Sequence, residues 1–324
     1  MAGSTWRGRS VLVTGANGFL GSWLSKRLVE EGANVVCFIR DALPKSFFNL
    51  SGTVHKVVGA HGTLEDYSSV ERVLNEFEVE FCFHLGAQAI VGTAERSPIS
   101  TYDSNIRGTW NVLEAVRRSS LVKGLVIASS DKVYGAKDQL PYTERDALNG
   151  LNPYDVSKVC ADLLAQSYFH TYGIVLGIAR SGNFYGPGDL NFSRVVPGTI
   201  RSLVRDEDPV IRSDGTYLRD YFYVEDAVEA FLTLGANLDK DNIKGQAFNF
   251  GTETPTSVMD VVDQLIQLSG KKGLKPVVLN QAVHEIKVQY LSCEKARAVL
   301  GWRHKTDLRE GLEKSYAWYK EFLS

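Results

Sequence analysis

The strongest constraint on the fold is a glycine-rich turn near the start of the sequence, in "VLVTGANGFLGSWLSKRL". Gly15, Gly18 and Gly21 lie there between a β-branched run and a segment with helical periodicity. The first glycine permits a tight turn, the second lets backbone approach a pyrophosphate, and the third lets helix and strand pack closely. A helix that begins here presents free N–H groups to an anion. The pattern therefore predicts a dinucleotide-binding βαβ unit, against the alternative of a merely structural turn.

Short β-branched runs and helical segments alternate through the first half of the chain. Runs such as "NVVCFI", "VEFCFHLGA" and "GLVIASS" are separated by segments such as "GSWLSKRLVEEG" and "DYSSVERVLNEF". This alternation predicts an α/β fold, a Rossmann-type doubly wound parallel sheet with a smaller interleaved α/β domain. We expect residues 1–185 to form the dinucleotide-binding domain, rejoined by about 220–255, and residues 186–324 to form mainly the substrate-binding domain. Ligands of such sheets bind at the carboxyl ends of the strands.

Composition and charge argue against several classes of protein. The net charge of −2 comes from 36 basic and 38 acidic side chains with no basic block, so neither nucleic acid nor a membrane surface is an expected partner. No apolar run approaches the roughly 18–20 residues that cross a bilayer. The histidines show no metal-ligand spacing, and we expect no metal. The four cysteines, which lack CxxC spacing, are interpreted as reduced packing residues of a cytoplasmic protein: Cys37, Cys82, Cys160 and Cys293.

Two further stretches carry groups suited to catalysis. In "NPYDVSKVCADL", Tyr154 and Lys158 are four residues apart and share one face of a helix. A phenol with a pKa near 10 is a poor base at neutral pH, so it needs a nearby ammonium group to stabilise the phenolate. In "VIASSDKVYG", an apolar strand ends in Ser130, Asp131 and Lys132. Polar groups at the carboxyl end of a buried strand predict chemistry at that edge of the sheet.

The chain resembles the extended short-chain dehydrogenases/reductases, and within them the nucleotide-sugar 4,6-dehydratases and epimerases. The matching stretches span nearly the whole chain and include "GANGFLGSWLS", "FHLGAQAIV", "NIRGTWNVLEA", "SSDKVYG", "PYDVSK", "RSGNFYGPGD" and "RDYFYVEDAVEA". CDP-glucose 4,6-dehydratases are the most similar subfamily, and GDP-mannose 4,6-dehydratases are more distant. The resemblance implies a tightly bound NAD or NADP, a nucleotide-sugar substrate, and a homodimer formed by "YDSNIRGTWNVLEAVRRS" and the helix that bears Tyr154.

The reaction implied by the resemblance oxidises C4 of the sugar, eliminates water across C5 and C6, and returns the hydride to C6. Ser130 and Tyr154 would act at the C4 oxygen, with Lys158 beside them. Asp131 would be the acid at C6 if burial raises its pKa. Lys132 would be the C5 base if its pKa is depressed; otherwise it orders Asp131 or the substrate, and the base lies elsewhere. The structural alternative is a salt-bridged Asp131–Lys132 turn.

Other residues follow from the resemblance with less force. Asn105 is implied to contact the cofactor, and the alternative is that it caps a helix. Arg219 is implied to contact the substrate, and the alternative is a surface ion pair with Asp220 or Glu225. Arg40 favours NADP and Asp41 favours NAD, so the choice stays open. The implied cofactor contacts are Gly15, Asn17, Gly18, Phe19, Leu20, Arg40, Asp41, Leu64, Leu85, Ala87, Asn105, Tyr154 and Lys158. The implied substrate contacts are Gln88, Ser130, Asn183, Arg194 and Arg219, of which Arg194 has simple surface exposure as its alternative.

The sequence departs from the family pattern at two places, and two other functions compete with that of a dehydratase. Thr63 stands where family members often have an adenine-contacting Asp. His284 and Glu285 stand where a UDP-galactose-type epimerase often has a phosphate-binding arginine. A 4-epimerase could use Ser130, Tyr154 and Lys158 but needs no acid at C6. A non-catalytic dinucleotide-binding regulator typically lacks the tyrosine or the lysine, and both are present here.

Overall fold

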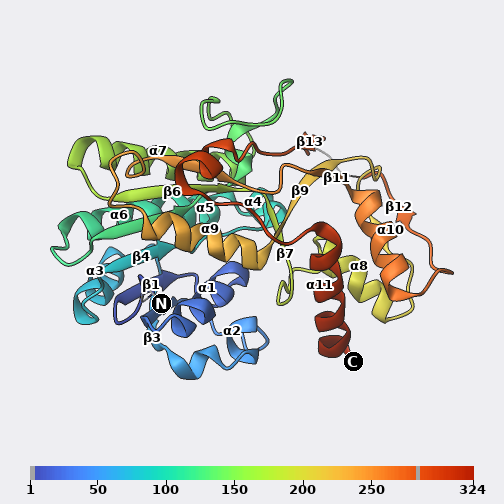
Figure 1. The fold of residues 1–324 in the computed structure, drawn as a ribbon, viewed down its shortest axis with the longest axis horizontal. Coiled ribbons are helices and arrows are strands. Elements are labelled where there is room, and N and C mark those ends of the chain that lie inside the picture. The colour runs from blue at the N-terminus through green and yellow to red at the C-terminus, as the bar shows by residue number, and fades with distance from the viewer. Residues whose placement is uncertain (1–3, 282–284) are drawn as a thin grey trace.

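A parallel sheet of seven strands organises the molecule (Figure 1). The computed structural model describes residues 4–281 and 285–324. The strand order is β10-β6-β5-β4-β1-β2-β3, so the direction of winding reverses between β1 and β4. Ligands of doubly wound sheets bind at this reversal. The strands are β1 (Ser10–Thr14), β2 (Asn34–Ile39), β3 (Val58–His61), β4 (Phe81–His84), β5 (Gly124–Ala128), β6 (Leu176–Ser181) and β10 (Ala247–Phe250).

Helices cover both faces of the sheet, as two separate apolar clusters show. On one face lie α3 (Tyr67–Glu76), α6 (Gly108–Arg118) and α7 (Pro153–Tyr172), whose Val73, Leu113 and Ala165 are fully buried. On the other face lie α1 (Phe19–Glu30) and α9 (Val224–Ala236), whose Leu24 and Phe231 are fully buried. Burial on both faces explains why the strands read as continuous apolar runs. The predicted fold class, a doubly wound parallel sheet, is confirmed.

A smaller group of elements follows the main run of the chain. Strand β9 (Leu218–Tyr223) pairs with β7 (Asn183–Tyr185), β11 (Pro255–Ser257) and β13 (Val288–Gln289), outside the large sheet. Helices α8 (Val195–Val204), α10 (Val258–Ser269) and α11 (Leu308–Leu323) share a third apolar cluster and lie together at the right of Figure 1. Between β9 and β11 the chain returns to the large sheet, since β10 pairs with β6. The predicted boundary at residues 185 and 186 stays a prediction.

The remaining elements are short and connect these layers. They are α2 (Phe47–Leu50), η1 (Thr53–Lys56), α4 (Val91–Arg96), α5 (Pro98–Tyr102), η2 (Asp103–Arg107), η3 (Asp131–Tyr134), β8 (Val210–Ile211), β12 (Val277–Val278) and η4 (Ala296–Leu300). Within the described ranges, no helix has the length and apolarity to cross a bilayer. Those ranges also hold no cluster of His, Cys, Asp and Glu that could bind a metal, and their four cysteines form no disulfide. His284 lies outside the described residues.

Candidate active site

One large cavity lies where the carboxyl ends of the main sheet meet the smaller group of elements. Its volume is about 1140 Å³, above the roughly 300–1,000 Å³ typical of a pocket for one small molecule. Most of the residues predicted to contact cofactor or substrate line it, although they come from widely separated parts of the chain. They are Gly15, Asn17, Gly18, Phe19, Leu20, Arg40, Asp41, Leu64, Leu85, Ala87, Ser130, Asp131, Lys132, Tyr154, Lys158, Asn183, Arg194 and Arg219.

The three glycines form a cradle that side chains would fill. Gly15 has a φ of +67°, and a Cβ there would lie 2.8 Å from the Cα of Gly86 at the end of β4. A Cβ on Gly21 would lie 2.1 Å from the carbonyl oxygen of Gly15. Gly18 is the N-cap of α1, so the first turn of that helix opens onto the cavity. This geometry fits a dinucleotide pyrophosphate at the helix N-terminus.

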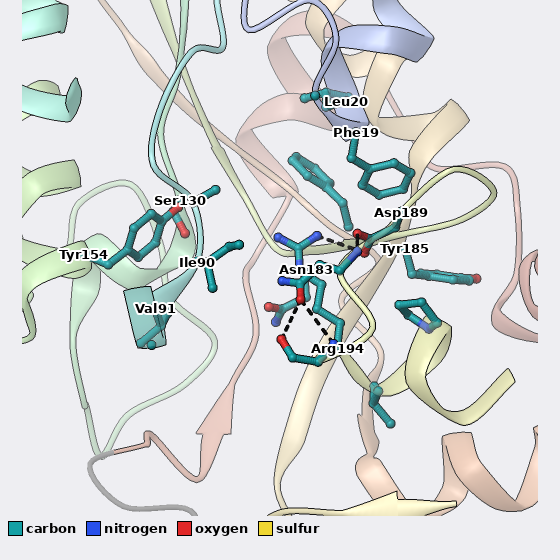
Figure 2. Close-up of a pocket in the computed structure, with 18 of the residues that line it drawn as sticks. Phe19, Leu20, Ile90, Val91, Ser130, Tyr154, Asn183, Tyr185, Asp189 and Arg194 are labelled. Atoms are coloured by element: carbon teal, nitrogen blue, oxygen red, sulfur yellow. Dashed lines mark hydrogen bonds and ion pairs between the residues drawn. The ribbon is translucent and has the colours of Figure 1, made fainter. Parts of the chain in front are cut away.

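Ser130 and Tyr154 lie together on one side of the cavity, as Figure 2 shows. Burial, and after it the Asp131 charge, raise the pKa of Tyr154 to about 12, against the opposing effects of Arg194 and the Ser130 hydroxyl. Lys158 donates to the carbonyl oxygen of Ala128, at 2.7 Å, which ties α7 to the end of β5. Burial lowers the pKa of Lys158 to about 8. That Lys158 acidifies the phenol of Tyr154 stays a prediction.

Asp131, which is buried, and Lys132, which is half-buried, follow each other at the start of η3. Asp131 is 2% exposed, and burial raises the pKa of its carboxyl group, while Lys132 and Ser130 lower it. One carboxylate oxygen accepts from the Ser130 hydroxyl at 3.0 Å. The other is buried and has no partner among the described residues. Burial lowers the pKa of Lys132, and its ammonium group donates to Gln289 at 2.7 Å rather than to Asp131. The two side chains therefore do not form a salt-bridged turn.

Across the cavity from Tyr154 lie Asn183 and Arg194 (Figure 2). Arg194 pairs with Asp189 at 3.0 Å, and its side chain is 38% exposed. Arg219 is 8% exposed and donates to the carbonyl oxygens of Leu218 and Lys287, while a second nitrogen pairs with Glu285 at 3.2 Å. Its ion pair is therefore with Glu285, not with Asp220 or Glu225. Besides the Asp131 oxygen, three buried polar atoms of cavity-lining residues lack partners among the described residues: Ser181 Oγ, Asn183 Nδ2 and the Tyr221 hydroxyl.

The two residues at the end of β2 pair with each other. Arg40 Nε contacts Asp41 at 2.7 Å, and both side chains are more than half exposed at the cavity rim. Asn17 donates to the backbone carbonyl of Asp41 at 2.6 Å, so the glycine turn is tied to this strand end. The ion pair leaves the choice between NAD and NADP open. Thr63 hydrogen-bonds Glu65, and Leu64 between them lines the cavity.

Two predicted contact residues, Asn105 and Gln88, do not line the cavity. Asn105 is 1% exposed, and its amide accepts from the Gln88 backbone N–H at 2.7 Å and donates to the Gln88 carbonyl and to Ser157. The Gln88 side chain accepts from the Ile90 N–H at 2.8 Å. These contacts fasten the loop after β4 to α7. The predicted ligand contacts of Asn105 and Gln88 stay predictions.

Sequence reasoning missed several residues of the site. Asp155 follows Tyr154, lines the cavity and is 3% exposed, and burial raises the pKa of its carboxyl group. Its position in the first turn of α7 was visible in the sequence. Asp189, Ser181 and Tyr221 also line the cavity, but no local pattern distinguishes them. Gln289 contacts Lys132 from 157 residues away, which only the tertiary structure reveals.

Comparison with known proteins places the chain in a family. The family model described as GDP-mannose 4,6 dehydratase matches residues 12–315. A curated relative, CDP-glucose 4,6-dehydratase of Salmonella typhimurium, is 30% identical over 333 residues, covering 98% of this chain and 92% of the relative.

Solved structures agree with that assignment. The UDP-glucose 4-epimerase of Thermotoga maritima, solved with UDP-glucose, has a TM-score of 0.89 and 27% identity, covering 97% of this chain and 100% of the other. The dTDP-glucose 4,6-dehydratase of Bacillus anthracis, solved in complex with NAD, has a TM-score of 0.84 and 25% identity, covering 97% of both chains. Both dehydratases and epimerases are therefore among the similar proteins. The chain belongs to the GDP-mannose 4,6-dehydratase family, within the nucleotide-sugar 4,6-dehydratases and epimerases of the extended short-chain dehydrogenase/reductase type.

Proposed function

We propose that this chain is a nucleotide-sugar 4,6-dehydratase and that CDP-glucose is its substrate. The observation that carries the proposal is the Asp131 carboxyl group. It is buried next to Ser130, its pKa is raised by burial, and one of its oxygens has no partner among the described residues. A protonated carboxyl group at the cavity can protonate a leaving hydroxyl, which oxidation and reduction at C4 alone do not require. The choice of CDP-glucose rests on the curated relative.

The glycine cradle supports NAD or NADP as the cofactor, because added side chains at Gly15 and Gly21 would meet backbone. When bound there, the dinucleotide supplies the hydride acceptor for C4 and the hydride donor for C6. Ser130 and Tyr154 lie side by side in the cavity, so both can reach one sugar oxygen. In its phenolate form, which the Lys158 ammonium group stabilises in this proposal, Tyr154 takes the C4 hydroxyl proton. The C4 ketone that results acidifies the proton at C5.

Asp131 and Lys132 then carry out the elimination. The amine of Lys132, whose pKa is lowered by burial, takes the C5 proton. Asp131 gives its proton to the C6 hydroxyl, which leaves as water. When the hydride reaches C6, Lys132 returns a proton to C5. Tyr154 ends the cycle with one proton more and Asp131 with one fewer, so exchange with solvent restores both groups.

Other residues that line the cavity supply groups suited to a nucleotide diphosphate and its sugar. Arg194 and Arg219 provide guanidinium groups, which match phosphate oxygens in geometry and charge. The unpartnered Ser181, Asn183 and Tyr221 atoms can bond the hydroxyl and phosphate oxygens of a ligand. A buried polar atom is costly when unpaired, so this set favours a ligand rich in oxygen.

A homodimer is part of the proposal. Trp110 on α6 is 43% exposed and Leu163 on α7 is 51% exposed, on the two helices that the resemblance assigns to the interface. Sedimentation velocity measures the state directly, and Leu163→Lys should shift a dimer toward the monomer. A monomeric wild-type protein would contradict this part of the proposal.

Mass spectrometry of the products tests the function. The purified protein is incubated with CDP-glucose, GDP-mannose, UDP-glucose or dTDP-glucose, and a dehydratase lowers the mass of its substrate by about 18, the mass of water. Asp131→Asn should abolish this loss and retain C4 oxidation, whereas Asp263→Asn, on the exposed face of α10, should behave as wild type. If sugar configuration changes without any loss of water, and Asp131→Asn leaves that reaction intact, the chain is a 4-epimerase. If no nucleotide sugar reacts, the proposed function fails, and a non-catalytic dinucleotide-binding regulator is the remaining alternative.

A further inference from the structure

The ε-amino group of Lys132 has an unusual partner for a candidate acid–base residue. It donates to the amide oxygen of Gln289 at 2.7 Å. Gln289 is the last residue of β13 and is fully buried. β13 pairs with β9, where Gln289 lies opposite Arg219. The contact therefore joins the smaller group of elements to the carboxyl end of β5, at the cavity.

A glutamine amide differs from a carboxylate in what it can offer a lysine. Its oxygen accepts from an ammonium group, and its NH2 group can donate to the lone pair of a neutral amine once the amide turns over. A carboxylate has only acceptors and adds a charge that favours the ammonium form. The amide nitrogen of Gln289 is buried and has no partner among the described residues, so no other contact fixes that end of the amide.

Charged groups face Lys132 from several elements. Asp131 precedes it on η3, Asp155 approaches from α7, Arg219 from β9, and Glu285 from the segment before β13. Burial and Arg219 favour the neutral amine, whereas Asp131, Asp155 and Glu285 favour the ammonium group. Between these opposing groups, Gln289 is a neutral partner in direct contact.

We propose that Gln289 is a positioning residue that holds the ε-amino group of Lys132 at the cavity in both of its protonation states. The ammonium form donates to the amide oxygen, and the neutral form accepts from the amide NH2 group. Lys132 can then exchange a proton without losing its place beside Asp131. The contact itself is seen in the structure, and only the use of the exchanged proton at C5 rests on the proposed function.

NMR of the full-length protein labelled with 13Cε/15Nζ-lysine tests the inference without substrate. The Lys132 signal is assigned as the one missing from Lys132→Met, and its pKa is measured in wild type, Gln289→Glu and Gln289→Met. In Gln289→Glu a carboxylate within contact distance should raise the Lys132 pKa by about 1–3 units. In Gln289→Met both forms lose their partner, and the pKa should fall because the charge-assisted bond of the ammonium form is the stronger of the two. Gln267→Glu, which adds the same charge on the exposed face of α10, should leave it unchanged.

Shifts of opposite sign support the inference, because a Gln289 that only packs against its neighbours without holding the ε-amino group predicts no fall of the Lys132 pKa in Gln289→Met. The inference is overturned if the Lys132 pKa in Gln289→Glu equals that in Gln267→Glu. It is also overturned if a folded Gln289→Met shows no fall in the Lys132 pKa. The pH profile of water loss adds a second readout: the limb that rises with deprotonation of Lys132 should move to higher pH in Gln289→Glu and to lower pH in Gln289→Met. If the wild type removes water from no nucleotide hexose, the proposed function fails while the NMR result still decides the role of Gln289.

Discussion

Asp162 on α7 is the buried charge whose loss should do the most damage away from the cavity. Its carboxylate accepts from Arg180 Nε at 2.8 Å and Nη2 at 2.9 Å. It also accepts from the Ser129 hydroxyl at 3.0 Å and from Gln166 at 2.7 Å. The side chains of Asp162 and Arg180 are 0% and 4% exposed. This one carboxylate therefore joins α7, β6 and the carboxyl end of β5.

Asp162→Asn should lower the free energy of unfolding by about 3–5 kcal/mol, the usual cost of removing one partner of a buried ion pair. The amide keeps one acceptor oxygen, but its NH2 group then faces the donors of Arg180. The guanidinium group is left buried without a counter-charge. The substitution also reaches the cavity, because the Asp162 charge opposes the burial that lowers the pKa of Lys158 to about 8. The Lys158 pKa should therefore fall further.

Urea denaturation at pH 7 measures the change, with Asp263→Asn on the exposed face of α10 as the matched control, expected within about 0.5 kcal/mol of wild type. A double-mutant cycle completes the test: Arg180→Met should cost much less in the Asp162→Asn background than alone, because the two sites are coupled. If Asp162→Asn costs less than about 1 kcal/mol, or if the two substitutions are additive, the ion pair does not stabilise this junction and the reasoning fails.

Three further predictions follow from buried groups. His84 is buried between the hydroxyl groups of Thr14, at 2.8 Å, and Thr109, at 3.1 Å. Burial lowers its pKa to about 3, so between pH 6.5 and 3 the unfolded chain binds more protons than the folded protein. Wild type should therefore lose about 5 kcal/mol relative to His84→Gln across this window, measured by urea titrations at several pH values, and parallel curves would contradict it. Gly21→Ala should weaken dinucleotide binding at least about ten-fold in a fluorescence titration and lower the free energy of unfolding by about 1–3 kcal/mol, because its Cβ would meet the Gly15 carbonyl. The control Gly59→Ala, which has open space around it, should bind the dinucleotide normally. Asn105→Ala should cost about 1–3 kcal/mol in urea because the Gln88 backbone groups lose their partners, and an unchanged midpoint would show that they find others.

The sequence indicated the large sheet and most of the cavity lining because both depend on local patterns. Buried parallel strands appear as apolar runs, and polar residues that follow them meet at one edge of the sheet. Ser130, Asp131 and the glycine turn could be placed in this way. The return of the chain to the large sheet could also be expected, since "AFNFGTE" has the character of a short buried strand, whereas its pairing with β6 could not.

Side-chain partners could not be predicted in the same way. The resemblance places Asn105 beside α7, but its bonds to the Gln88 backbone depend on how the loop after β4 packs against η2. The choice of Glu285 by Arg219, and of Gln289 by Lys132, depends on the register of a two-residue strand, β13. Such a short strand has no periodicity to detect.

The opposing pKa shifts of Asp131 and Lys132 bear directly on the proposed elimination. Burial pushes both groups toward their neutral forms, and their mutual attraction pushes both toward their charged forms. In the proposed reaction the neutral pair is the reactant state, because the acid must hold a proton and the base must lack one. Transfer of one proton to the C6 hydroxyl and one from C5 converts it into the charged pair, whose attraction in a buried site stabilises the elimination product. Burial is the larger effect on both groups, so the site shifts each toward the neutral form that the proposed elimination requires.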